Sequence, residues 1–261
     1  MPRVRLDSLL AERGLFASRS RAAAAVIAGQ VHVGPGRSRA AKPGQLVAAD
    51  VELDVEAPAP FVSRGGVKLA NALDALGIDV SGRLALDVGA STGGFTDCLL
   101  QRGAGHVVAL DVAYGELDWR LRGDDRVTVV ERVNARALEP SQLPFAPDLV
   151  VVDVSFISLA KVLPAVLACA AERFDCLPMV KPQFEVGRGV VGRGGVVRDP
   201  GPRRDAIAAV ARAAAPAAVL GFAPSGLPGP AGNRETFVWR GEPGREGAVA
   251  DVDAAIAEVD V

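Results

Sequence analysis

The chain has 261 residues, of which 49% are hydrophobic and 23% are charged. This composition allows one large core plus a small second domain, and it excludes a disordered or collagen-like chain. The formal net charge is only −2, but residues 1–42 contain eight Arg and Lys residues against two acids. A basic end on a near-neutral protein predicts contact with a polyanion.

Membrane insertion, disulfide bonding and zinc binding have no sequence pattern to support them. No apolar run reaches the roughly 18 residues that a membrane span needs, and the N-terminus lacks the apolar core of a signal peptide. The three cysteines lie in apolar segments, which indicates reduced core residues. The two histidines are not accompanied by a cysteine pair at zinc-ligand spacing. We therefore expect a cytoplasmic protein without a metal and without stable membrane association.

Residues 1–58 predict a small basic domain that contains two helices and short strands. The segment VRLDSLLAERG predicts a helix that Gly14 ends, and SRAAAAVIAG predicts a second helix that Ser18 or Ser20 caps. QVHV and VELDV have the alternating pattern of strands. Charge alone leaves two interpretations open, because basic residues form solvated surfaces as well as RNA-binding ones.

The same segment resembles a known RNA-binding fold. RLDSLLAERGLFASRSRAAAAVIAGQVHV is similar to the small RNA-binding domain first described in a small-subunit ribosomal protein, the S-four type. The matching features are Arg-Leu-Asp at residues 5–7, Ser-Arg at residues 18–19, and Gly29 followed by alternating valines. The resemblance implies that this domain binds RNA, with candidate contacts from Arg3, Arg5, Arg19 and Arg21.

A proline- and glycine-rich joint follows, and we place a linker at residues 59–66 and a second domain at residues 67–261. Val67–Leu76 has a helical pattern, and a short closing helix is expected beyond Glu242. Repeated strand–helix alternation predicts an α/β fold with an open, mostly parallel sheet and helices on both faces. Ligands of such sheets bind at the carboxyl ends of the strands. Strands are predicted at Arg83–Val88, His106–Asp111, Val127–Glu131, Asp148–Asp153, Leu177–Lys181, Ala217–Phe222 and Glu235–Arg240.

The segment LALDVGASTGGFTD predicts a strand, a tight glycine turn and the start of a helix. It does not fit the dinucleotide pattern, because Ser91 stands at the second glycine position, and no Gly-Lys-Ser/Thr follows to make a phosphate loop. The turn resembles the S-adenosylmethionine loop of Rossmann-like methyltransferases of the FtsJ type. That resemblance implies an acid facing the methionine end and a second acid on the ribose. The implied cofactor contacts are Asp87, Gly89, Ala90, Ser91, Gly93, Gly94, Phe95, Asp111, Asn134 and Asp153.

Asp153 ends a predicted central strand, and two chemistries explain an acid there. Amine methyltransferases have Asn/Asp/Ser-Pro-Pro-Tyr/Phe at this strand end, but residues 153–156 read Asp-Val-Ser-Phe and lack both prolines. Methylation of a ribose 2′-hydroxyl instead needs a base, and Lys181 at the end of the next strand is the candidate. A lysine base must be neutral when it accepts a proton, and a second cation such as Lys68 favours that form. A structural ion pair is the plain alternative for each of these residues.

Four charged residues match, in order, the Lys-Asp-Lys-Glu tetrad of FtsJ-like 2′-O-methyltransferases: Lys68, Asp153, Lys181 and Glu235. SRGGVKL, DVGASTGGFT, DVAYGEL, SFISL, VKPQFEVG, GGVVRDP and GLPGPAGNRETF extend the resemblance over nearly the whole chain. The family is the TlyA type, whose members are described as haemolysins and as ribosomal RNA 2′-O-methyltransferases.

The resemblance implies an S-adenosylmethionine-dependent enzyme with a Rossmann-like sheet of about seven strands and Lys181 as the base. It implies ribosomal RNA or ribosomal subunits as partners, with further RNA contacts from Arg64, Arg188 and Arg193. Three rival functions are a membrane-active haemolysin, methylation of an RNA base amine, and a catalytically silent RNA-binding factor.

Overall fold

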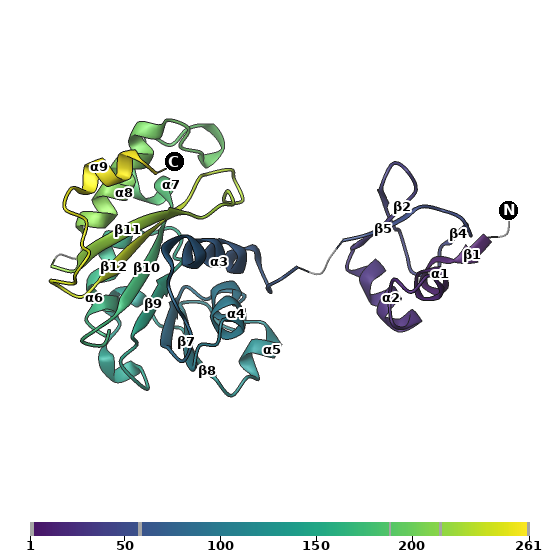
Figure 1. Ribbon diagram of the computed structural model, residues 1–261, viewed down its shortest axis with the longest axis horizontal. Coiled ribbons are helices and arrows are strands. Elements are labelled where there is room, and N and C mark those ends of the chain that lie inside the picture. Colours follow the sequence, from purple (N-terminus) through teal and green to yellow (C-terminus); the bar gives the residue numbers. More distant parts are fainter. Residues whose placement is uncertain (1–2, 57–58, 188, 214–215, 260–261) are drawn as a thin grey trace. The chain divides into compact units, whose positions relative to one another are not determined.

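The computed structural model describes residues 3–56, 59–187, 189–213 and 216–259. The chain divides into two compact units, Met1–Ala59 and Pro60–Val261, and each is described here by itself (Figure 1).

The first unit packs two helices against short antiparallel strands around its own small core. Ser18 caps the second helix by accepting a hydrogen bond from the Arg21 backbone N–H, as one of the two predicted caps. Val4, predicted in the first helix, lies in a strand, and Val51 precedes the strand in which it was predicted. The elements are β1 Arg3–Arg5, α1 Leu6–Glu12, α2 Arg19–Ile27, β2 Val31–Val33, β3 Ser38–Arg39, β4 Leu46–Ala48 and β5 Leu53–Val55.

The second unit alternates strands and helices as the sequence predicts. Its first half contains α3 Arg64–Leu76, β6 Leu84–Val88, α4 Gly94–Gln101, β7 His106–Asp111, α5 Trp119–Arg122, β8 Val127–Glu131, the 3-10 helices η1 Ala135–Ala137 and η2 Pro140–Gln142, and β9 Leu149–Val152. Its second half contains η3 Leu159–Lys161, α6 Leu163–Leu167, β10 Asp175–Val180, α7 Pro182–Glu185, η4 Arg193–Gly195, α8 Pro200–Arg212, β11 Ala218–Pro224, β12 Thr236–Gly241 and α9 Val252–Ala257.

Seven strands form one sheet in the order β11-β12-β10-β9-β6-β7-β8. β8, β7, β6, β9 and β10 are parallel, whereas β12 runs antiparallel to both of its neighbours. This confirms the predicted α/β fold with a mostly parallel sheet. The chain moves outward from β6 in one direction and from β9 in the other, so the strand order reverses between them. Ligands of such sheets bind outside the carboxyl ends of the strands at this reversal.

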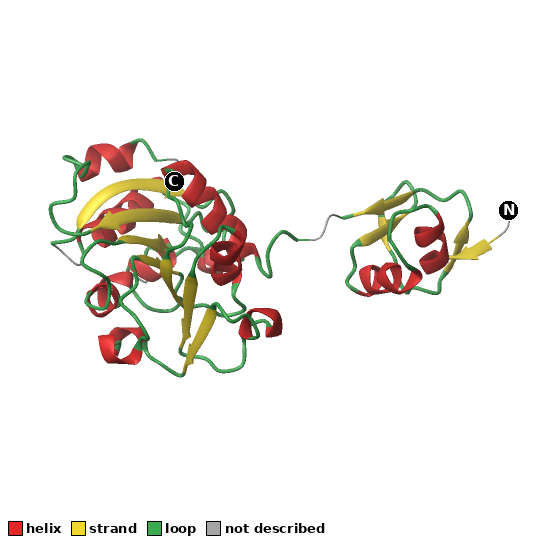
Figure 2. Cartoon of the chain, turned by 60° about the horizontal axis from the view of Figure 1, so that its bottom comes forward, coloured by secondary structure: helices red, strands yellow, loops and turns green. Residues whose placement is uncertain are grey.

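Alternate residues of each central strand enter two separate hydrophobic cores, because side chains of a strand point to opposite faces. Leu86 and Val88 of β6 pack with α6, α8 and α9, whereas Ala85 packs with α3, α4 and α5 on the other face. The views in Figures 1 and 2 show helices on both sides of the strands. The continuous apolar runs of β7 and β9 follow from this burial on both faces.

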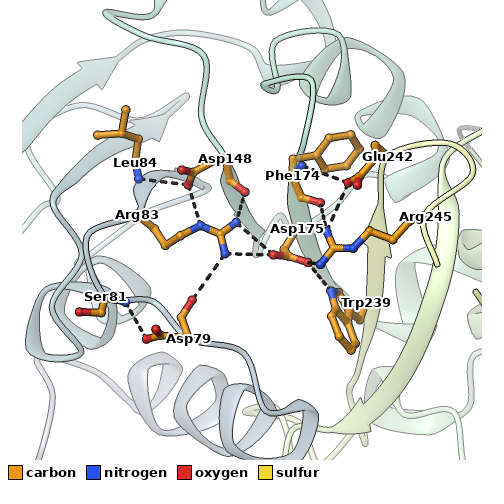
Figure 3. A network of polar contacts seen from close by, with 10 residues as sticks. All are labelled: Asp79, Ser81, Arg83, Leu84, Asp148, Phe174, Asp175, Trp239, Glu242 and Arg245. Carbon is orange, nitrogen blue, oxygen red and sulfur yellow. Dashed lines mark hydrogen bonds and ion pairs between the residues drawn. The ribbon is translucent and has the colours of Figure 1, made fainter. Parts of the chain in front are cut away.

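A polar network closes the sheet at the amino ends of the parallel strands (Figure 3). Asp175, which begins β10 and is 5% exposed, accepts from Arg83 at 3.0 Å and from the Trp239 indole at 2.8 Å, and pairs with Arg245 at 3.2 Å. Arg83 also donates to Asp148 at 2.9 Å, just before β9. These contacts join the amino ends of three parallel strands to antiparallel β12. The network therefore lies opposite the carboxyl ends of these strands.

Five predicted strands of the second unit differ from the structure by one or two residues at an end, and two helix boundaries differ by more. Helix α3 begins at Arg64, so residues 64–66 of the predicted linker are helical, with Ser63 as the cap. Val62 N–H donates to Asp97 at 2.8 Å, and Phe61 packs against the core of the second unit. The closing helix is shorter than its apolar spacing predicts, because Val249 pairs with the backbone of Val219 instead of entering it.

Candidate active site

Two adjoining cavities lie at the carboxyl ends of β6 and β9, where the strand order reverses. They share Gly89, Ser91 and Asp153 in their walls. The first, here the lysine cavity, has a volume of about 430 Å³ and is lined by Ser63, Arg64, Gly65, Lys68, Gly89, Ala90, Ser91, Thr92, Gly94, Phe95, Asp153, Lys181, Pro230 and Glu235. The second, here the carboxylate cavity, has a volume of about 500 Å³ and is lined by Val88, Gly89, Ser91, Leu110, Asp111, Val112, Glu116, Val133, Asn134, Ala135, Asp153, Val154, Ser155, Phe156, Ile157 and Val162.

The glycine turn forms the floor shared by both cavities. Gly89 has a φ of +85°, and a Cβ at this position would lie 2.5 Å from the carbonyl oxygen of Asp153. Only glycine therefore permits β6 to turn this close to the end of β9. Ser91 also has a left-handed backbone, with a φ of +47°. The turn thus exposes backbone groups in the position predicted for a cofactor loop.

Asp111 stands at the end of β7, as predicted, and lines the carboxylate cavity. Its two oxygens accept from the backbone N–H groups of Ser91 and Ala113, each at 2.8 Å. A carboxylate oxygen has two lone pairs, so each oxygen of Asp111 can accept a further hydrogen bond from a ligand. Asn134 lines the same cavity and caps η1, and Glu116, which the sequence analysis did not select, supplies a second carboxylate.

Two predicted cofactor contacts, Asp87 and Gly93, do not line either cavity. Asp87 is fully buried beneath the turn, where one oxygen accepts from the Thr96 hydroxyl at 2.7 Å and the other has no hydrogen-bond partner. Burial, with a smaller repulsion from Asp153, raises the pKa of Asp87 to about 7.

Gly93 has a φ of +95°, and a Cβ there would lie 2.3 Å from the Leu121 side chain and 2.8 Å from that of Leu117. The space beside Gly93 is therefore filled by the apolar core of the second unit. Asp87 and Gly93 support the turn and line neither cavity, and their role as cofactor contacts stays a prediction.

The four residues of the predicted tetrad all line the lysine cavity, where they form two ion pairs. Lys68 Nζ lies 2.5 Å from Glu235 Oε2, and Lys181 Nζ lies 2.5 Å from Asp153 Oδ1. Lys181 also donates to the hydroxyl of Ser155 at 3.0 Å. The sequence analysis did not select Ser155, although its position two residues after a strand-end acid was a usable signal. The four charges cancel formally, and Lys181 contacts two residues, Asp153 and Ser155, that line the carboxylate cavity.

One wall of the lysine cavity is the loop between β11 and β12, drawn in yellow-green beside α3 in Figure 1. Arg64, exposed at the start of α3, donates to the carbonyl of Pro228 at 2.6 Å. Asn71, two turns further along the helix, donates to the carbonyl of Ser225 at 3.0 Å. Both bonds fasten this loop to α3, so Arg64 is held at the cavity by its own contact.

Phe156 is the most exposed large apolar side chain among the described residues, with 91% of its surface accessible. Its backbone has a φ of +64°, which is unusual for an aromatic residue and points to a constrained turn after Asp153. The ring lies 5.1 Å from that of Phe184, between ring centres, and lines the carboxylate cavity. Phe156 was not among the predicted site residues.

The predicted RNA contacts are distributed over both units. Arg3, Arg5, Arg19 and Arg21 are all exposed on the first unit. Arg5 and Arg19 both pair with buried Asp7, at 2.8 and 3.1 Å, and the hydrogen bond from Arg5 holds the pKa of Asp7 well below its usual range. Arg193 is exposed on a glycine-rich loop of the second unit, and Arg188 lies outside the described residues.

A comparison with known families decides the class of protein. The model of the FtsJ-like methyltransferases matches residues 61–242, which include both cavities. The chain belongs to the FtsJ-like methyltransferase family. This methyltransferase is 52% identical over 241 residues to the 16S/23S rRNA (cytidine-2′-O)-methyltransferase TlyA of Mycobacterium tuberculosis, with 91% of this chain and 89% of the relative covered. The predicted TlyA-type family is thereby confirmed.

Two further relatives bear the other name of the family. The methyltransferase is 40% identical over 197 residues to Hemolysin A of Brachyspira hyodysenteriae, with 75% of this chain and 81% of the relative covered. A solved structure of a haemolysin-named protein from Streptococcus thermophilus has a TM-score of 0.73 and 35% identity, and the match covers 99% of this chain and 96% of that one. Within the residues that the structure describes, no helix is long and apolar enough to cross a membrane.

Proposed function

We propose that this methyltransferase transfers a methyl group from S-adenosylmethionine to a ribose 2′-hydroxyl of ribosomal RNA. The observation that carries the proposal is the set of contacts of Lys181, which lines the lysine cavity, with Asp153, shared by both cavities, and with Ser155 of the carboxylate cavity. The name of the Mycobacterium tuberculosis relative, a cytidine-2′-O-methyltransferase of 16S and 23S ribosomal RNA, supports the substrate.

The residues of the carboxylate cavity fit S-adenosylmethionine. Asp111 and Glu116 offer carboxylate oxygens to the two ribose hydroxyls, and Asn134 offers an amide nearby. The apolar side chains of Val133 and Ile157 suit the flat face of a nucleobase. When bound, the cofactor supplies an electrophilic methyl group on a sulfonium.

The lysine cavity then takes the ribose that accepts the methyl group. A protonated hydroxyl is a poor nucleophile, and a base that removes its proton as the new bond forms lowers the barrier. We assign this role to the neutral amine of Lys181, which becomes an ammonium that Asp153 and Ser155 stabilise. The second ion pair, between Lys68 and Glu235, lines the same cavity and holds α3 beside the residue that precedes β12.

Phe156 is proposed to stack on the base of the target nucleotide. Enzymes that modify nucleotides within folded RNA turn the target out of its stack and replace the lost contact with an aromatic ring. Phe156 is exposed, conformationally constrained and three residues from Asp153. Its contact with Phe184 fixes one side of the ring and leaves the rest accessible to a base.

The first unit is proposed to bind RNA through its exposed arginines. The pairing of Arg5 and Arg19 with Asp7 orders these long side chains before any RNA arrives, which lowers the entropy lost on binding. Arg3 and Arg21 are exposed on the same unit, and neither forms an ion pair with an acid among the described residues. This unit supplies affinity and orientation, while the chemistry is confined to the second unit.

The direct test is to methylate isolated ribosomal subunits with S-adenosylmethionine that carries a labelled methyl group. After complete digestion to nucleosides, the label should elute with 2′-O-methylated nucleosides, and the modified position should resist alkaline cleavage on its 3′ side. Label recovered on a base amine would contradict the proposed acceptor, and absence of label from both subunits would contradict the proposed substrate.

A further inference from the structure

A glycine-rich loop follows α7 and carries one of the predicted RNA contacts. Residues 189–198, here the arginine loop, include Arg193 and the positive-φ glycines Gly194 and Gly195. Two backbone hydrogen bonds of 3.1 Å, from Gly192 to Val196 and from Gly195 to Gly192, are internal to the loop. Glycines make an exposed loop costly to order, so its position depends on contacts with the rest of the domain.

One buried side chain supplies such a contact from a distant part of the chain. Asn233, only 1% exposed, accepts from the Val197 N–H at 2.9 Å and donates to the Gly195 carbonyl at 2.8 Å. Both ends of the amide are therefore used on the arginine loop, 36 and 38 residues earlier in the chain. A buried amide whose donor and acceptor are both satisfied is a specific contact, because loss of either bond leaves a polar group without water.

Asn233 also supports, through its backbone, the β11–β12 loop that forms one wall of the lysine cavity. Its backbone carbonyl accepts from the Gly229 N–H at 2.8 Å and so closes the turn that contains Pro230, a residue lining the cavity. Two residues later, the Glu235 carbonyl accepts from the Ser225 N–H at 2.9 Å, and the Glu235 side chain holds Lys68. Asn233 thus joins two structures: the arginine loop through its side chain and the cavity wall through its backbone.

We infer that Asn233 is a positioning residue that holds the arginine loop against the wall of the lysine cavity, so that Arg193 meets the RNA backbone beside the target ribose. This inference rests on the proposed function, because it states that the arginine loop contacts the RNA backbone beside the target ribose. Arginine contacts to phosphates orient RNA without reading its sequence. A loop held in place before binding loses less entropy on binding. Loss of the Asn233 hydrogen bonds that hold the arginine loop should therefore raise KM for RNA more than it lowers kcat.

The test uses the full chain with Asn233→Ala and measures the loop and the reaction separately. Trypsin cuts after exposed arginines in mobile loops, so cleavage after Arg193, followed by mass spectrometry, reports how firmly the loop is held. We expect this cleavage to accelerate about ten-fold and KM for ribosomal RNA to rise about as much, the fold-change that corresponds to losing roughly 1.4 kcal/mol of ordering. The affinity for S-adenosylmethionine and kcat should stay within about two-fold of wild type.

Two further variants separate positioning from general stability. Asn71→Ala removes a hydrogen bond that fastens the other end of the same β11–β12 loop, and it should leave cleavage after Arg193 unchanged. Asn233→Ser keeps a neutral polar group that is too short to bond both partners, so its cleavage rate should lie between those of wild type and Asn233→Ala. This variant also serves if Asn233→Ala does not fold.

A double-variant cycle tests whether Asn233 affects RNA binding through Arg193. If Asn233 acts through Arg193, adding Arg193→Ala to Asn233→Ala should raise KM no further than the larger single effect. The inference is overturned by unchanged cleavage, by faster cleavage with unchanged KM, by additive effects of the two substitutions, or by loss of cofactor affinity in Asn233→Ala. A wild-type enzyme that methylates no ribose would overturn the proposed function instead, while the cleavage rates would still show whether Asn233 holds the loop.

Discussion

Lys68 and Glu235 form an ion pair at 2.5 Å although 167 residues separate them in the chain. The side chains are 8% and 2% exposed, so both charges are largely removed from water. Such a pair is costly to form and more costly to break, because an unpaired buried charge remains when one partner is lost. The pair joins α3 to the residue just before β12 and brings both ends of the tetrad into one cavity.

Glu235→Gln should therefore destabilise the protein as well as impair methyl transfer. It leaves the Lys68 ammonium buried without a charge partner, and we expect the free energy of unfolding to fall by about 3–5 kcal/mol. Denaturant unfolding measures this loss, with exposed Glu246→Gln as the control. The double variant Lys68→Met with Glu235→Leu should recover most of the stability and remain inactive. Wild-type stability of Glu235→Gln would show that the pair is not buried in solution.

Lys181→Ala should abolish methyl transfer and leave the affinity for S-adenosylmethionine nearly unchanged, because the base acts only on the acceptor hydroxyl. Calorimetry measures the cofactor affinity, and single-turnover incorporation of a labelled methyl group measures the chemical step. Lys161→Ala, on an exposed lysine of η3, is the matched control and should behave as wild type. Turnover of Lys181→Ala near the wild-type rate would remove Lys181 as the base.

Phe156→Ala should weaken RNA binding without affecting the fold, since the ring is 91% exposed. Loss of one stacking contact should raise KM for RNA by an amount equivalent to about 1–3 kcal/mol. Phe156→Tyr, which keeps a ring, should restore most of the affinity. Trp119→Ala removes another exposed aromatic side chain, 79% accessible, and serves as the control. Equal effects of the two alanine variants would argue against a specific stacking site.

The raised pKa of Asp87 should make the stability of the cofactor-free protein depend on pH. Burial raises its pKa from 3.8 to about 7, so between these values the folded state binds a proton that the unfolded state has released. The contribution of Asp87 to stability is therefore full below about pH 4, falls as the pH rises to about 7, and is level above that. Asp87→Asn should remove this slope and raise the free energy of unfolding at pH 8 by as much as about 4 kcal/mol. Parallel stability–pH curves for wild type and variant would contradict the shifted pKa.

Arg21→Glu should reduce RNA affinity and the steepness of its salt dependence, because a lost phosphate contact releases fewer counterions. Each contact removed should lower the slope of log affinity against log salt by about 0.7–0.9. Arg173→Glu makes the same change in charge at an exposed site near the amino end of β10 and is the control. Cofactor affinity should be unchanged in both variants. Equal salt slopes for Arg21→Glu and wild type would exclude this arginine from the RNA contact.

The sequence was sufficient for features that depend on local patterns. The strands His106–Asp111 and Val127–Glu131 have the predicted bounds. The first is buried on both faces and appears as an apolar run, and the second is a half-buried edge strand rich in β-branched residues. The carboxyl-end positions of Asp111 and Asp153 followed from the same runs. Parallel strands place their carboxyl ends at one edge of a sheet, so the approach of Asp153 and Lys181 at that edge was also predictable.

Features that depend on packing between distant segments were decided only by the tertiary structure. Gly93 stands in the predicted cofactor loop, yet the space beside it is filled by Leu117 and Leu121, more than twenty residues later. Asp87 lies beneath the turn because the strand alternates its faces, and burial, which no short motif records, sets its pKa. Ser155 contacts the side chain of Lys181, 26 residues away, and Asn233 contacts the backbone of the arginine loop, 36 residues away. Hydrogen bonds of this kind are short-ranged and directional, so they exist only where the folded chain brings donor and acceptor within about 3 Å.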